Sequence, residues 1–369
     1  MPTSRLLPLQ ERPAWSQAWS DYHDASGGTF FTSLAWIESW ISTLPAGSVP
    51  WLFECGGVPE AQALGILVRS VDWLGGFVPI RRWWLHATGR PPLDDITIEF
   101  NGLVSNGTQG AAERCLFEAL DECGRSWDQL IVPHAADPER WIDAARTRGL
   151  HVERSSHACH YVDFSALRES GVLYESALGK KTRYLLRRAR KEIESSLGPL
   201  HVELAQPGAE TEAYFEAMLA LHERYWQSRG MRGAFAEPAI REFHRTLFRN
   251  EAGARACRMY RVGAGRGIVG YLYLFVWHGV AYFYQSGIDY DGIGRSRSPG
   301  YVTITEVIKA LEGTEVSRFE FLAGDNLYKS RLATGSSVLC SLEIQRPTLG
   351  NVVLRMGRRI RRTANHDSP

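Results

Sequence analysis

VAYFYQSGID (280–289), a glycine-containing turn and SPGYVTITEVIKALEG (298–313) form the most informative stretch of the sequence. The first run is rich in aromatic and β-branched residues and predicts a strand. The second begins a helix at its proline and ends at Gly313, a common pattern for helices. VSRFEFLAGD (316–325) then predicts another strand. We therefore expect a strand, a turn, a helix and a second strand in direct succession.

Helices and further strands precede this stretch. TEAYFEAMLALHERYWQSRG (211–230) and AIREFHRTLFRNEAG (239–253) predict helices that each end at a glycine. ARACRMYRVG (254–263) and IVGYLYLFVWHG (268–279) predict strands joined by tight glycine turns. We expect these strands to pair with 280–289 in an antiparallel sheet.

The first half of the chain repeats this order. FFTSLAWIESWIST (30–43) predicts a helix, three runs at 51–57, 63–76 and 96–104 predict strands, and GAAERCLFEALDECGR (110–125) predicts a helix before one more strand. Two unrelated domains would be the alternative explanation. We predict an α+β (mixed α/β) protein of two tandem domains, each a mostly antiparallel mixed sheet flanked by helices.

The expected domain boundaries follow from this repeat. Residues 1–155 form the first domain, residues 156–350 the second, and residues 351–369 a basic tail that frays. A length of 369 residues fits about two domains.

Charge balance and cysteine usage exclude several classes of function. Forty-two basic against 41 acidic side chains give a net charge of +1, so no overall field attracts nucleic acid or membrane. The six cysteines are scattered without metal-ligand spacing, so we predict no metal and a reducing compartment. No signal-peptide pattern and no apolar run of membrane-spanning length occurs, so we expect a cytoplasmic protein without stable membrane insertion.

The turn at the start of the 299–313 helix is a candidate anion site. A pyrophosphate needs several backbone N–H donors and the positive end of a helix, and a short Gly- and Ser-containing turn into a helix provides both. Arg295 and Arg297 would add charge-assisted bonds. The candidate residues are Arg295, Arg297, Ser298, Gly300 and Tyr301. A surface loop with a proline-initiated helix explains the same residues, so both interpretations stay open.

This turn resembles the Q/R-x-x-G-x-G/A pattern with which acyltransferases of the GNAT superfamily bind the pyrophosphate of acyl-CoA. Arg295 and Gly300 match its ends, whereas Ser298 replaces its middle glycine. The order of four motifs is similar to that of the BioF2-like (CelD/BcsL) acetyltransferase family: LHERYWQSRGMRGAF, YQSGID, RSPG and FEFLAGDNLYKSRLA. The likeness covers most of residues 160–345, and FFTSLAWIESW extends it more thinly into the first half.

The resemblance implies direct acyl transfer from acyl-CoA, acetyl-CoA foremost, to an amine of a small molecule or saccharide precursor. It also implies a link to polysaccharide biosynthesis. In GNAT domains the sheet splays at the end of its central strand to admit the thioester. Tyr284 and Gln285 end that strand here and would contact the donor, although sheet packing explains Tyr284 equally well.

Asp325, Tyr328 and Lys329 lie just beyond the strand FEFL (319–322), in a loop position where function commonly lies. The acceptor amine must lose a proton and the leaving thiolate must gain one. We assign Asp325 as the base and Tyr328 as the acid, and expect Lys329 to hold a phosphate or carboxylate of a substrate. Alternatively, Asp325 pairs with Lys329 or Arg331 and only fixes the loop.

His222 and Trp226 are four residues apart on a predicted helix and share one face. One interpretation has them line the acceptor pocket, with His222 relaying a proton and Trp226 forming a wall. The other interpretation is that His222 is a hydrogen-bonded residue packed among apolar neighbours.

GKKTRYLLRRARKEIES (179–195) predicts a docked helix with a basic outer face. A solvated surface explains it, and so does attraction of a polyanion, which admits acyl carrier protein or tRNA as the donor carrier. The chain resembles Fem-like aminoacyltransferases in its tandem architecture, so transfer from aminoacyl-tRNA is the alternative function. A non-catalytic GNAT-like binding protein is the third. The oligomeric state stays open.

The first half lacks an equivalent of the candidate anion turn. NGLVSNGTQGAAER (101–114) has Glu113 early in the predicted helix and no arginine shortly before it. We therefore expect the first domain to be degenerate and donor binding to fall to the second.

Overall fold

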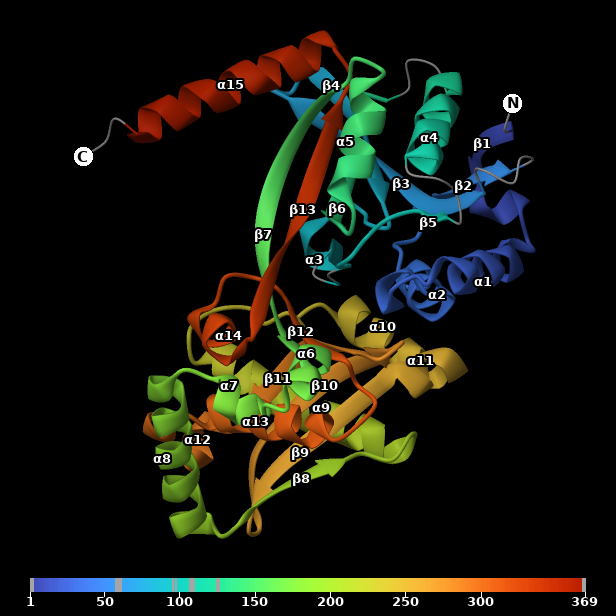
Figure 1. Ribbon diagram of the computed structural model, residues 1–369. Coiled ribbons are helices and arrows are strands. Elements are labelled where there is room, and N and C mark those ends of the chain that lie inside the picture. The colour runs from blue at the N-terminus through green and yellow to red at the C-terminus, as the bar shows by residue number, and fades with distance from the viewer. Residues whose placement is uncertain are drawn as a thin grey trace. The chain divides into compact units, whose positions relative to one another are not determined.

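The computed structural model describes residues 3–56, 62–94, 96, 98–105, 110–123 and 127–366. The chain divides into two compact units. Unit 1 consists of Met1–Ile37, Leu44–Ser156 and Leu339–Pro369, and unit 2 of Glu38–Thr43 and His157–Val338. Each unit is a mostly antiparallel mixed sheet with helices, so the predicted α+β (mixed α/β) class with two tandem domains is confirmed (Figure 1).

Unit 1 has the strand order β1-β2-β3-β4-β6-β13, and β5 pairs with β3. Only β4 and β6 are parallel neighbours among these strands. The strands are β1 (Thr3–Pro8), β2 (Pro50–Gly56), β3 (Ala63–Leu74), β4 (Val78–Leu85), β5 (Val104–Ser105), β6 (Gln129–Ala135) and β13 (Gly335–Gln345).

Its helices are α1 (Trp15–Ser26), α2 (Leu34–Ile41), α3 (Pro91–Asp94), α4 (Ala111–Glu122), α5 (Pro138–Arg146) and α15 (Leu349–His366), with 3-10 turns at Leu9–Glu11 and Phe30–Thr32. Aromatic residues dominate the core between sheet and helices. Trp83 of β4, Phe117 of α4 and Trp141 of α5 are all buried in one cluster. The order β4, α4, β6 therefore places a helix between two parallel strands.

Unit 2 has the strand order β7-β12-β11-β10-β9-β8, in which β11 and β12 are parallel and the other neighbouring strands are antiparallel. The strands are β7 (His151–Asp163), which belongs to this unit from His157 onward, β8 (Leu200–Leu204), β9 (Cys257–Ala264), β10 (Gly267–Trp277), β11 (Val280–Ile288) and β12 (Arg318–Ala323). The helices are α6 (Phe164–Ser170), α7 (Tyr174–Ala177), α8 (Lys180–Leu197), α9 (Ala209–Gln227), α10 (Pro238–Arg249), α11 (Glu251–Ala256), α12 (Tyr290–Ile293), α13 (Pro299–Glu312) and α14 (Leu327–Leu332), with a 3-10 turn at Arg295–Arg297.

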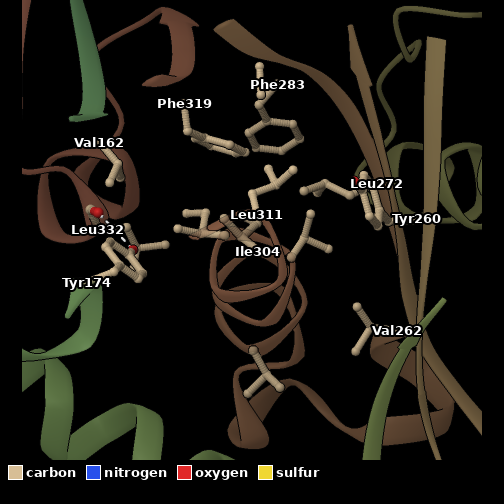
Figure 2. Close-up of a cluster of buried hydrophobic side chains, with 14 of the residues drawn as sticks. Val162, Tyr174, Tyr260, Val262, Leu272, Phe283, Ile304, Leu311, Phe319 and Leu332 are labelled. Atoms are coloured by element: carbon tan, nitrogen blue, oxygen red, sulfur yellow. Dashed lines mark hydrogen bonds between the residues drawn. The ribbon is translucent and has the colours of Figure 1, made fainter. Parts of the chain in front are cut away.

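The core of unit 2 lies between α13 and the sheet. Figure 2 shows Ile304 and Leu311 of α13 close to Phe283 and Phe319, which come from the parallel strands β11 and β12. These four side chains are buried. Burial of such side chains contributes about 1.5 to 3 kcal/mol each, so α13 is held firmly with its N-terminus at the end of β11.

The last part of the chain differs from the expected boundary at residue 350 and from the expected frayed tail. β13 pairs with β6 from Cys340 onward, which returns the chain to unit 1. α15 then forms a helix instead of a free tail. Asn351 is buried and donates to the carbonyl of Asp128, and Arg358 pairs with Glu153 and Glu343. A pairing between residues so distant in sequence leaves no local signal.

Two further expectations concern segments around these elements. Residues 106–109, within the first-half segment compared with the anion turn, lie outside the described residues. Among the helices that are described, none combines the length and the apolar character needed to cross a membrane.

Candidate functional site

β11 and β12 begin as a parallel pair and then separate. Three consecutive residue pairs join them, the last being Tyr282 with Glu320, although both strands are described to their ends. β12 then turns away through Leu322 and Gly324, whose φ angles of 62° and 121° lie in the left-handed region. The strands therefore diverge over their carboxyl-terminal halves.

A β-bulge marks the same place in β11. The register with β10 passes from Tyr273–Gln285 to Leu274–Phe283, which leaves Tyr284 as the extra residue. A bulge bends its strand and often re-aims groups next to a site. The bulge lies directly after the last pair between β11 and β12, so backbone irregularity and strand divergence coincide.

The side chains of Tyr284 and Gln285 occupy this bend. The ring of Tyr284 is packed against His244 and Phe275, at centroid distances of 5.0 and 5.1 Å. The side-chain oxygen of Gln285 accepts a hydrogen bond from the N–H of Ser286 at 3.0 Å. Both predicted donor contacts thus lie at the divergence, where packing also engages Tyr284.

The turn from β11 into α13 presents a helix N-terminus. Asp289 caps α12 by accepting from the N–H of Gly292, and Ser298 precedes α13 with a left-handed φ of 50°. α13 has 14 residues and no acid in its first turn. A Cβ on Gly300 would lie 3.0 Å from the Tyr290 hydroxyl. The partial positive charge of this helix end is therefore not neutralised by its own first turn.

Arg295 and Arg297 lie in the 3-10 turn immediately before this helix end. Arg295 stacks on the rings of Tyr290 and Tyr225, with its guanidinium carbon 5.0 and 5.4 Å from their centroids. Arg297 donates to the Ser196 hydroxyl at 3.0 Å. Within the described residues neither arginine forms an ion pair. Two uncompensated cations therefore flank the predicted anion turn.

Three tyrosines surround the same helix end. The ring of Tyr328 lies 6.4 Å from that of Tyr301 and 6.5 Å from that of Phe321. Burial raises the pKa of Tyr328 far above its usual value, and the neighbouring Tyr290 and Tyr301 raise it further. Tyr328 therefore keeps its proton at neutral pH.

Asp325 follows the left-handed Gly324 and is 85% exposed. Its Oδ1 lies 3.8 Å from Nε2 of His160 on β7, and the His160 side chain is only 12% exposed. In the described part of the chain, Nε2 of His160 has no hydrogen-bond partner. Neither Lys329 nor Arg331, the partners considered from sequence, forms an ion pair with Asp325 in this region.

Lys329 is placed differently from its predicted role as a ligand for a substrate anion. The residue is 7% exposed, and its ammonium donates to the carbonyls of Leu322 and Ala323 at 3.1 and 2.8 Å. The left-handed turn at Leu322 brings these two carbonyl oxygens onto one side. Lys329 therefore fixes the end of β12 from within the protein.

His222 and Trp226 do share a face of α9, as expected. The indole N–H of Trp226 donates to Nε2 of His222 at 2.9 Å, and the imidazole packs against Phe235. Burial lowers the pKa of His222 to about 4, so the ring is neutral. Because Nε2 accepts, we place the proton on Nδ1, which is buried and has no partner in the described structure.

The family comparison concerns the segment that carries this geometry. Residues 180–330 match the model of the acetyltransferase (GNAT) domain. Unit 2 therefore contains a segment that is similar to the GNAT acetyltransferase domain. The match spans β8 to β12 with α8, α9 and α13, and so includes both the strand divergence and the anion turn. No curated protein sequence matches the chain.

Solved structures resemble the chain over most of its length. FemX is 10% identical, with 89% of this chain and 95% of that chain covered and a TM-score of 0.56. A conserved protein of unknown function from Bacteroides thetaiotaomicron is 12% identical, with 94% and 100% covered and a TM-score of 0.53. The structure of L-PGS from Bacillus licheniformis is 12% identical, with 93% and 94% covered and a TM-score of 0.51. At such identities the likeness establishes the fold alone.

Unit 2 also contains groups that sequence reasoning missed. His160 and Tyr290 contact or influence predicted site residues, yet neither lies in a recognisable motif. The alternation along β7 places His160 on the same face as the buried Val162, which is the one signal that could have drawn attention to it. In the described residues, no group of three or more His, Cys, Asp or Glu side chains is arranged to hold a metal ion.

Proposed function

We propose that the GNAT domain of unit 2 transfers an acyl group from an acyl thioester to an amine. The observation that carries this proposal is the divergence of β11 and β12, which leads directly to the N-terminus of α13. A thioester arm entering at the divergence would leave its phosphates at that helix end, where N–H groups and the helix dipole favour anions. Arg295 and Arg297 flank the position without an acidic partner among the described residues.

The proposed chemistry is direct attack within a ternary complex. The amine nitrogen forms a bond to the thioester carbonyl carbon, and the carbon–sulfur bond breaks. Asp325, supported by His160, takes the proton from the amine. Tyr328, which its raised pKa keeps protonated, supplies a proton to the departing thiolate.

The proposed donor is acyl-CoA, with acetyl-CoA foremost, held by Ser298, Gly300 and Tyr301 through the first turn of α13. The proposed acceptor is an amine of a small molecule or saccharide precursor. This choice of acceptor rests on the similarity of four motifs to the BioF2-like (CelD/BcsL) family. The proposed link to polysaccharide biosynthesis rests on the same similarity.

A specific observation favours aminoacyl-tRNA as an alternative donor. α8 exposes a row of cations, and Tyr184 among them is 59% exposed. These cations are Lys180, Lys181, Arg187, Arg188 and Lys191. Arg297 donates to Ser196 near the C-terminal end of the same helix, so α8 adjoins the anion turn. Cations interleaved with an exposed aromatic ring suit a nucleic acid.

The test is a thermal-unfolding and calorimetric titration with acetyl-CoA, acyl carrier protein and charged tRNA, because a ligand of the native state raises the melting temperature. We expect acetyl-CoA to bind, and to bind equally well to the variant K180Q/K181Q/R187Q, in which cations of α8 are neutralised. Binding of charged tRNA alone, lost in that variant, would favour the aminoacyl alternative. Acetyl-CoA binding without turnover on any amine would support the non-catalytic alternative.

A further inference from the structure

The hairpin β3–β4 of unit 1 exposes apolar side chains at its tip. β3 is buried from Ala63 to Val68, whereas the remaining residues up to Leu74 are exposed or half-buried. Trp73 is 62% exposed and Phe77 is 87% exposed. The tip therefore extends beyond the core, with a tryptophan and a phenylalanine at its end.

α15 adds an apolar stripe from the same unit. Leu349, Val353 and Met356 are 84%, 51% and 60% exposed. Their spacing of four and three residues places them on one helix face. The first turn of α15 packs against the start of β4, since a Cβ on Gly350 would lie 3.3 Å from the side chain of Val78. The stripe thus begins beside the hairpin tip.

Charge accompanies the apolar surface. α15 carries five arginines and no acidic residue in its sequence. Arg355 and Arg358 bond residues of unit 1 and so hold the opposite face of the helix against the sheet. Arg359, Arg361 and Arg362 continue the basic sequence.

We propose that unit 1 docks onto the surface of an anionic phospholipid bilayer through the hairpin tip and the stripe of α15. A basic amphipathic helix lies in the plane of a bilayer surface, and tryptophan and phenylalanine insert at the headgroup boundary. A protein partner would also cover apolar residues, but the run of arginines without acids complements lipid phosphate. This inference concerns unit 1 alone and is independent of the proposed acyl transfer.

The test is co-sedimentation of the full-length protein with vesicles. We expect binding to equal parts of phosphatidylglycerol and phosphatidylcholine and little binding to phosphatidylcholine alone. W73S/F77S should lower the partition coefficient by at least about 10-fold, because two large apolar side chains no longer enter the boundary. R359Q/R361Q/R362Q should lower it by about 100-fold at low salt.

L173S/M231S provides the matched control, because both residues are exposed apolar side chains of unit 2. It should bind vesicles as the wild type does. Thermal unfolding and acetyl-CoA binding, measured on every variant, report whether the fold and the GNAT domain are intact. Equal vesicle binding by W73S/F77S and the wild type would overturn the proposal. The proposal would also be overturned if the wild type were a dimer that does not bind vesicles and W73S/F77S were a monomer. The patch would then join two copies of the chain.

Discussion

In units 1 and 2 alike, a helix connects two parallel strands, but the ends of those strands are bridged in unit 1 and separate in unit 2. In unit 2, β11 and β12 diverge after three residue pairs. In unit 1, Asn101 lies between the ends of β4 and β6. Its N–H donates to the carbonyl of His134, its carbonyl accepts from Ala136, and its amide group donates to the carbonyl of Leu85. One residue thus bonds both strands where unit 2 leaves them apart.

Two more differences point the same way. The β3–β4 register runs without a shift, whereas β11 contains the bulge at Tyr284. The helix ends differ in charge as well. Glu113 is buried in the first turn of α4, where burial raises its pKa, whereas the first turn of α13 has no acid. The fold is shared, and the features on which the proposed thioester site rests belong to unit 2.

The largest expected effect comes from removing the polar end of the unit 2 site. Asp325→Asn keeps the shape of the side chain and removes its charge. We expect turnover to fall by about 10²- to 10⁴-fold with little change in donor affinity, as for loss of a general base. Steady-state kinetics with the substrates identified by titration measure it. Asp143→Asn, at an exposed aspartate of unit 1, is the control. Near-normal turnover of D325N would place the base elsewhere, with His222 the next candidate.

A second change makes the helix end of unit 2 resemble that of unit 1. Gly300→Asp adds an acid to the first turn of α13, where the helix dipole stabilises it. Its repulsion of a phosphate at contact distance is about 4 kcal/mol near a surface, so CoA affinity should fall by more than about 100-fold. Gly313→Asp, at the other end of α13 in open space, is the matched control in calorimetry. Normal CoA binding by folded G300D would refute the assignment of the anion turn.

A third change opens the space in unit 1. Asn101→Ala removes the side-chain bonds to Leu85 and His86, the latter 2.8 Å long, and leaves buried polar groups without partners. We expect a loss of about 2 kcal/mol in the free energy of unfolding, measured by urea denaturation. Donor affinity should not change, because Glu113 still disfavours an anion at α4. Unchanged stability would show that Asn101 does not close unit 1, and a second CoA site would show that Glu113 does not keep an anion away from α4.

The sequence predicted the elements that depend on local signals. α13 begins at the proline and ends at the glycine from which it was predicted. The aromatic runs lie in β10 and β11, as predicted. The order strand, helix, strand therefore followed from residues near one another in the chain. The likeness to GNAT domains added the divergence of two strands, which local patterns alone do not reveal.

Long-range contacts explain what the sequence did not predict. Lys329 is polar and close to the site, yet a left-handed turn at Leu322 brings two carbonyl oxygens to its ammonium. His160 meets Asp325 across more than a hundred residues. β13 pairs with β6 although it follows the second domain in sequence. Each of these contacts depends on where a distant part of the backbone lies. The chemistry of a single residue does not reveal that position.

The smallest effect tests whether the closure of unit 1 depends on a neutral histidine. His86 is buried beside Asn101, its Nε2 accepts from the N–H of Ile66, and burial lowers its pKa to about 4. An unfolded histidine has a pKa near 6.5, so between these values the unfolded chain binds more protons. Stability is then complete above about pH 6.5 and is lost as the pH falls towards 4. Between pH 7 and pH 5.5 His86 should account for a loss of about 1 kcal/mol. His86→Gln should remove that part of the pH dependence in urea denaturation, while the part due to the buried His222 and His244 of unit 2 stays. An identical pH dependence in the variant and the wild type would mean that His86 takes up its proton without opening the network around Asn101.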